Sequence, residues 1–127
     1  MLQKEFYSAF MSYDEKNLIT VRFKDGIDIN KEEISLLVNW SLEVVENKPF
    51  YLLVDARDIL SSMDHESRKF FAEHKEYNQL NIAQAIVVNN MPIRLIAMAY
   101  YKLYKHSNPI QVFKDIEEAK LWLFSHG

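Results

Sequence analysis

The sequence contains no cysteine and only two glycines, Gly26 and Gly127. A chain without cysteine has no thiol nucleophile, disulfide or thiolate metal site, and such a composition fits a reducing cytosol. Two isolated glycines cannot build a phosphate-binding P-loop, a dinucleotide-binding G-x-G-x-x-G turn or the G-x-S-x-G turn of many hydrolases. The most easily recognised nucleotide-binding motifs and nucleophile motifs are therefore excluded.

The sequence also lacks long apolar runs and blocks of one charge. Its longest uncharged apolar run, residues 95–101, is far shorter than the roughly 20 residues that span a bilayer. Glu5 lies where a signal peptide would begin its apolar region. The formal net charge is −3, whereas nucleic-acid-binding domains usually carry a strongly basic stripe. We therefore expect a cytoplasmic protein with no membrane span and no nucleic-acid partner.

What remains is a composition suited to one folded domain. The chain has 127 residues, and 49% of them are hydrophobic. A domain of this size buries roughly two thirds of the surface that its unfolded chain exposes. We therefore predict a single domain over residues 1–127, with no linker, repeat or low-complexity segment.

Hydrophobic patterning predicts a hairpin followed by alternating helices and strands. Apolar runs over residues 6–11 and 18–23, separated by a polar turn, are typical of an antiparallel hairpin. Three further strands are predicted over residues 50–54, 82–88 and 110–113. Four helices are predicted to begin after Asn30, after Ser62 or Asp64, near Pro92 and after Asp115. Because strands joined by helices are mostly parallel, the fold class is a single mixed α/β sheet with an antiparallel N-terminal hairpin and mostly parallel strands after it.

Two details of this prediction can be checked directly. The second helix is expected to carry Phe70, Phe71, His74 and Tyr77 on one stripe and to end in a turn over residues 78–81. The predicted core includes Leu53, Phe70, Ile86, Ile96, Leu103 and Trp122.

The order of elements, the size, the Asp55-Ala56-Arg57 end of the central strand and the C-terminal block over residues 112–123 resemble the SpoIIAA-like, or STAS-like, small domains. Anti-sigma-factor antagonists of this group switch partners when a serine at the start of the helix after the central strand is phosphorylated. Asp64 matches the aspartate before that serine, and His65 stands at the position of the serine. The resemblance implies a regulatory domain with a protein partner, while SEC14-like relatives imply a lipid or other apolar ligand.

The densest group of polar side chains follows the central strand, where open α/β sheets bind their ligands. We expect a binding or regulatory loop there, approached by residues that follow the next strand. The candidate residues are Asp55, Arg57, Asp58, Ser61, Ser62, Asp64, His65, Ser67, Arg68, Asn89, Asn90 and Arg94. Structural roles also fit several of them, since Ser62 or Asp64 can cap a helix, Arg57 can pair with an acid, and Asp55 or Asp58 can pair with Arg94. Ser61, Ser62 and Ser67 are the candidates for phosphorylation.

No pattern in the sequence identifies an enzyme. None of the four histidines has a partner at metal-ligand spacing, and no spacing sets a base against a nucleophile. We therefore predict no metal, no cofactor and no catalytic residue. The leading hypothesis is a non-enzymatic regulatory or protein-interaction domain, the alternative is a small-ligand or lipid binder with its pocket at the carboxyl ends of the strands, and a hydrolase is third.

Two aromatic features leave alternatives open. Residues 100–106 form an aromatic and basic segment. It fits either a helix end that covers the core or a site for single-stranded nucleic acid or a phosphate-bearing ligand. Trp40 lies off the main apolar stripe of the first helix, where it fits either a contact with a second copy in a homodimer or a cover for the sheet edge.

Overall fold

A six-stranded mixed sheet forms the centre of the protein. The computed structural model describes residues 1–58, 62–92, 94–95, 98–99 and 108–126. In spatial order the strands are β1 (Leu2–Glu5), β2 (Ala9–Tyr13), β3 (Leu18–Phe23), β5 (Phe50–Asp55), β7 (Asn81–Val87) and β8 (Ile110–Phe113). β1, β2 and β3 pair antiparallel, whereas β3, β5, β7 and β8 pair parallel. The predicted fold class is confirmed, and β1 is an additional strand that the sequence did not predict.

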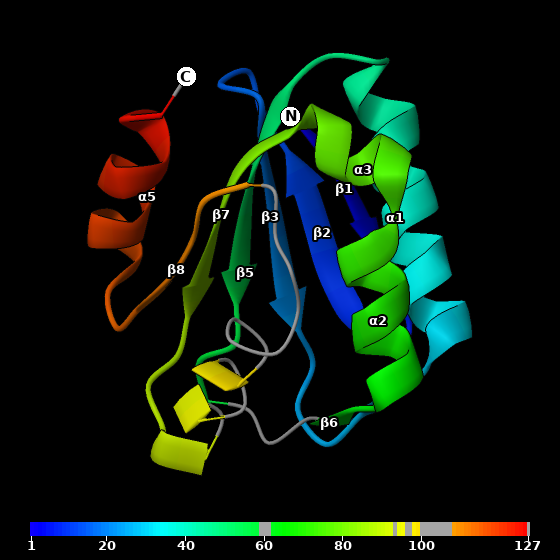
Figure 1. The fold of residues 1–127 in the computed structure, drawn as a ribbon, viewed down its shortest axis with the longest axis vertical. Coiled ribbons are helices and arrows are strands. Elements are labelled where there is room, and N and C mark those ends of the chain that lie inside the picture. The colour runs from blue at the N-terminus through cyan, green and yellow to red at the C-terminus, as the bar shows by residue number, and fades with distance from the viewer. Residues whose placement is uncertain (59–61, 93, 96–97, 100–107, 127) are drawn as a thin grey trace.

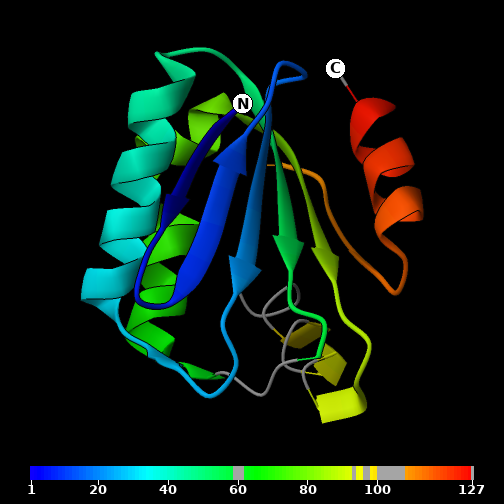
Figure 2. The same ribbon diagram turned by 180° about the vertical axis from the view of Figure 1, so that it is seen from behind.

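The helices cover the two faces of this sheet unequally (Figures 1 and 2). One face packs against α1 (Lys31–Val45), α2 (His65–Glu73) and α3 (Lys75–Leu80). The opposite face packs against α5 (Ile116–Phe124), which contacts β5, β7 and β8. On the α5 side, Leu18 at the start of β3 is buried beside Ala119 and Leu123. Among the described residues no helix covers the rest of β1, β2 and β3 on that side.

A second, very short sheet lies beyond the carboxyl end of β3. It consists of β4 (Asp28–Ile29) and β6 (Ser62–Met63), which pair parallel. This pairing joins the segment before α1 to the segment before α2. The sequence did not predict it, because two-residue strands produce no periodic pattern.

Three of the four predicted helix starts are confirmed by their caps. The side chain of Asn30 accepts a hydrogen bond from the Glu33 amide at 2.9 Å. The Asp64 side chain caps α2 and the Asp115 side chain caps α5 in the same way. Each cap satisfies a backbone N–H group that has no partner inside its helix.

The prediction of one continuous helix through Tyr77 is wrong, because the chain breaks at His74. His74 Nδ1 accepts a hydrogen bond from the Tyr77 amide at 3.2 Å, so this side chain begins α3 as an N-cap. The expected turn over residues 78–81 is consequently replaced by the end of α3 and the start of β7. The new helix direction buries Tyr77, whose ring packs against Phe50 and Phe71.

The core has a layer on each side of the sheet. Leu53 and Ile86 are buried as predicted. Phe70 and Trp122 are only partly buried and pack at the margins of the core, so their assignment to it is partly wrong. The predicted core residues Ile96 and Leu103 and the aromatic segment 100–106 lie outside the described residues. Trp40 is half-buried and meets Phe6 edge to face, with ring centroids 6.3 Å apart.

In the part of the chain that the structure describes, no helix combines the length and apolar character that a transmembrane span requires. The predicted helix near Pro92 is helical at residues 91, 92, 94, 95, 98 and 99.

Leu53 provides the first test of this fold. Leu53 lies on β5, is 1% exposed and belongs to the core layer between the sheet and α5. We expect Leu53→Ala to lower the free energy of unfolding by about 2–5 kcal/mol, because it removes a buried side chain and leaves a cavity. A denaturant titration measures this loss. Leu36→Ala is the control, because Leu36 is half exposed on α1. If Leu53→Ala lowers the free energy of unfolding no more than Leu36→Ala does, the assignment of Leu53 to the core is wrong.

Candidate functional site

Two arginine side chains converge on one buried carboxylate at the end of the central strand. The parallel register places Arg22 of β3 directly beside Asp55 of β5. Arg22 Nη1 lies 2.9 Å from Asp55 Oδ2. Arg57 donates from Nε to Oδ1 at 3.0 Å and from Nη2 to Oδ2 at 3.1 Å, which is a two-point contact with the same carboxylate. We call Arg22, Asp55 and Arg57 the arginine–aspartate cluster.

The electrostatics of the cluster keep Asp55 ionised. Burial by itself would raise the pKa of Asp55. Hydrogen bonds from Arg57 and the positive charges of Arg22 and Arg57 outweigh that effect, so the pKa of Asp55 lies below its ordinary value. The hydrogen bond to Asp55 in turn raises the pKa of Arg57. The two guanidinium groups share one negative charge, so the cluster carries a net positive charge of one.

A reciprocal pair of hydrogen bonds ties the following loop to the next strand. The Asp58 amide donates to Asn89 Oδ1 at 2.8 Å, and Asn89 Nδ2 donates to Asp58 Oδ1 at 2.6 Å. Asp58 has a φ of 60°, in the left-handed region that aspartate tolerates better than most residues. The structure therefore brings Asn89 to the loop after β5, as the parallel pairing of β5 and β7 predicts.

Hydrogen bonds made by Asp64 and Ser67 hold the start of α2 in place. The Asp64 side chain accepts from the Ser67 amide at 2.8 Å, which lowers the pKa of Asp64. Ser67 is fully buried, and its hydroxyl donates to the Ile29 carbonyl at 3.3 Å. Ser67, one of the three candidates for phosphorylation, is therefore not exposed in this structure. The first residue of α2 is the exposed His65, so this position offers no hydroxyl.

The remaining candidate residues are Ser61, Ser62, Arg68, Asn90 and Arg94. The Arg68 amide donates to the Asp64 carbonyl, and the Arg94 amide donates to the Asn90 carbonyl, both in the first turns of helices. Among the ion pairs of the described residues none joins Arg94 to Asp55 or Asp58, although the sequence had suggested such a pair, and Asp55 pairs with Arg22 and Arg57 instead. Ser61 lies outside the described residues, and Ser62 is described only as part of the β6 backbone.

Sequence reasoning missed Arg22. Its alternation with the apolar residues Ile19, Val21 and Phe23 places it on the opposite face of β3 from them. That signal was present in the sequence. What the sequence did not contain was the strand order, which makes β5 rather than another strand the neighbour of β3.

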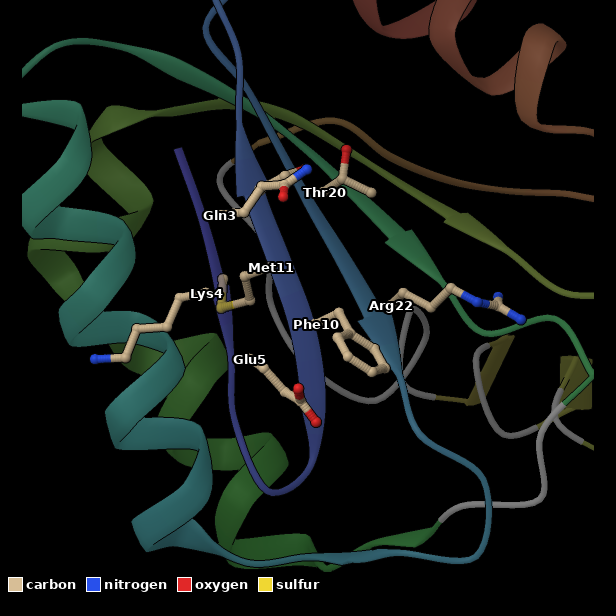
Figure 3. Close-up of a pocket in the computed structure, with 8 residues that line it drawn as sticks. Gln3, Lys4, Glu5, Phe10, Met11, Thr20 and Arg22 are labelled. Atoms are coloured by element: carbon tan, nitrogen blue, oxygen red, sulfur yellow. The ribbon is translucent and has the colours of Figure 1, made fainter. Parts of the chain in front are cut away.

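A groove crosses the part of the sheet that α5 leaves exposed (Figure 3). It has a volume of about 450 Å³, and it runs over β1, β2 and β3. Its lining residues are Gln3, Lys4, Glu5, Phe10, Met11, Ser12, Thr20 and Arg22. Arg22 therefore belongs both to this groove and to the arginine–aspartate cluster. The sequence did not predict the groove, because β1 was not recognised as a strand.

The described residues contain no group of three or more His, Asp or Glu side chains arranged to hold a metal ion. The chemistry that the cluster offers is recognition of an anionic group, because arginine presents several N–H donors in a planar arrangement that matches carboxylates and phosphates.

Comparison with known proteins places this architecture in a structural class. A crystal structure of an uncharacterised protein of the DUF3478 family from Shewanella loihica PV-4, which has a SpoIIAA-like fold, is similar with a TM-score of 0.63 and 9% sequence identity. The similarity covers 91% of this chain and 92% of that one, so the fold is SpoIIAA-like, as the sequence resemblance predicted. The pattern of the domain of unknown function DUF7793 matches residues 11–126, and the chain belongs to that family. No curated protein matches it.

The pH dependence of stability tests the arginine–aspartate cluster. We expect Asp55→Asn to lower the free energy of unfolding at pH 7 by about 1–3 kcal/mol, because hydrogen bonds to a charged acceptor are lost. Since the pKa of Asp55 is lowered on folding, its contribution is complete above the ordinary value of 3.8 and is lost as the pH falls through the folded-state value.

The difference between the wild-type protein and Asp55→Asn should therefore narrow below about pH 4. Denaturant titrations from pH 2 to pH 7 measure it. Glu15→Gln, in the exposed turn between β2 and β3, is the control. A difference that stays constant over this range would show that the Asp55 charge contributes nothing.

Proposed function

We propose that this chain is a non-enzymatic regulatory domain that binds a protein partner at the carboxyl ends of β5 and β7. The surface consists of Arg22, Arg57, Asp58 and Asn89. The arginine–aspartate cluster carries the proposal, because it fixes two partly exposed cations at this edge. The SpoIIAA-like fold agrees with the proposal but does not establish it.

Preorganisation is the first argument for a binding role. The side chains of Arg22 and Arg57 are 43% and 37% exposed, while the Asp55 side chain between them is 5% exposed. A flexible side chain that is already held in place loses less conformational entropy when a partner binds. Arginine is also enriched among the residues that contribute most to protein interfaces.

The mixture of charges is the second argument, and it favours a protein partner over a small anion. Asp58 and Asp115 lie close enough to Arg57 to raise its pKa. A surface that presents both signs within a short distance specifies the orientation of a partner that carries the complementary pattern. An acidic side chain of the partner would meet Arg22 or Arg57, and a hydrogen-bond donor or cation would meet Asp58.

Binding measurements on the partner test this function. The protein is isolated from its own cells, and native mass spectrometry identifies what accompanies it. We expect a protein, and we expect Arg57→Gln to weaken its binding at least about tenfold, a loss of roughly 1.4 kcal/mol. The control is Lys48→Ala, because Lys48 is exposed just beyond the C-terminal end of α1. This variant should bind the partner with unchanged affinity.

Two results would contradict the proposal. If Arg57→Gln binds the partner with the affinity of the wild-type protein, the cluster is not the interface. If the accompanying species is a small molecule or lipid and no protein is found, the alternative of a ligand-binding domain replaces the proposed function.

A further inference from the structure

The exposed part of the sheet has an ordered arrangement of side chains. Residues paired across neighbouring antiparallel strands lie on the same face. One row across β1, β2 and β3 consists of Gln3, Ser12 and Thr20, and the next consists of Glu5, Phe10 and Arg22. Figure 3 shows residues of both rows along the groove. We call these six residues the uncovered face.

The second row carries opposite charges at its two ends. Glu5 lies at one end, Arg22 lies at the other, and the half-exposed Phe10 stands between them. With neighbouring strands about 4.8 Å apart, the backbones of Glu5 and Arg22 are about 10 Å apart, and the ring of Phe10 separates the two side chains. The row is therefore acidic, aromatic and basic in order.

We infer that the uncovered face binds the same face of a second copy of this chain. The argument is charge complementarity under two-fold symmetry, which is the commonest symmetry of homodimers. A two-fold axis that lies between two stacked sheets, parallel to β2 and over Phe10, places Glu5 of each copy opposite Arg22 of the other. The two Phe10 rings meet at the axis, and the uncharged polar row Gln3, Ser12 and Thr20 meets its own counterpart.

The alternative orientation of the axis fails on electrostatics. An axis in the same plane but perpendicular to the strands would place Glu5 opposite Glu5 and Arg22 opposite Arg22. Like charges across an interface are unfavourable. The charge pattern therefore selects a single arrangement, in which the strands of the two sheets run in nearly the same direction, as aligned sheets do.

The side chains at both ends of the row are held before a second copy arrives. Lys24 Nζ lies 2.6 Å from Glu5 Oε2 and 4.7 Å from the centre of the Phe10 ring. At the other end, Asp55 holds Arg22. Glu5 and Arg22 nevertheless remain accessible, with 62% and 43% of their side chains exposed.

The size of the face indicates a weak dimer. Three strands about 4.8 Å apart and about five residues long cover an area of roughly 15 by 17 Å. This is well below the roughly 800 Å² per partner of a standard interface. We therefore expect a dimer that forms and dissociates with protein concentration in the micromolar to millimolar range.

Sedimentation equilibrium of the full chain over a range of concentrations tests the inference. The wild-type protein should dimerise, and higher salt should weaken the dimer. Glu5→Arg and Phe10→Ser should each raise the dissociation constant at least about tenfold. Their matched controls are Glu43→Arg and Leu36→Ser, at exposed positions on α1, and both should leave the constant unchanged.

A mixing experiment tests whether Glu5 of one copy meets Arg22 of the other. Glu5→Arg and Arg22→Glu should each be monomeric alone, but an equimolar mixture should form a heterodimer in which both charge pairs are restored. Arg22→Glu places a second carboxylate beside Asp55, so circular dichroism must first show that it folds. If it does not fold, Glu5→Arg and Phe10→Ser decide the question without it.

Two outcomes overturn the inference: a wild-type protein that is monomeric at every concentration, or a dimer that neither Glu5→Arg nor Phe10→Ser weakens. A monomer would leave the uncovered face to a different partner. Glu5→Arg and Phe10→Ser test the inference separately from the proposed function, because neither residue belongs to the surface of Arg22, Arg57, Asp58 and Asn89.

Discussion

The parallel pairing of β5 with β3 on one side and with β7 on the other is the constraint on which the remaining features depend. It brings the carboxyl ends of three strands to one edge, so that Arg22, Asp55 and Val87 lie side by side in the register. The cluster of Arg22, Asp55 and Arg57 and the Asp58–Asn89 hydrogen bonds both follow from this alignment. A shift of one residue between β3 and β5 would move Arg22 to the opposite face from Asp55.

Unequal covering of the sheet is the second determinant. The face toward α1 and α2 is closed by a continuous apolar core, whereas α5 covers β5, β7 and β8 and leaves most of β1 to β3 exposed on its side. Arg22 lies where these two regions meet, since it is paired with Asp55 and also lines the groove on β1 to β3. A contact on the uncovered face and a contact at the strand ends therefore involve the same guanidinium group.

Local patterns in the sequence predicted the elements well, and non-local contacts were the main source of error. Asn30, Asp64 and Asp115 marked three helix starts, because a capping side chain acts on an amide three residues away. His74 broke the predicted second helix through the same kind of contact, but histidine is not among the usual caps. The partners of Asp55 and Ser67 could not be predicted in full, because Arg22 and Ile29 become their neighbours only after the strands are arranged in space.

The central claim is that a buried, ionised Asp55 holds Arg22 and Arg57 in place. The most direct measurement is an NMR titration of the Asp55 carboxyl carbon in the wild-type protein. A midpoint below the ordinary value of 3.8 is the result that the two arginine contacts predict. A midpoint at or above that value would mean that burial outweighs the arginines, and the cluster would then not be held by charge.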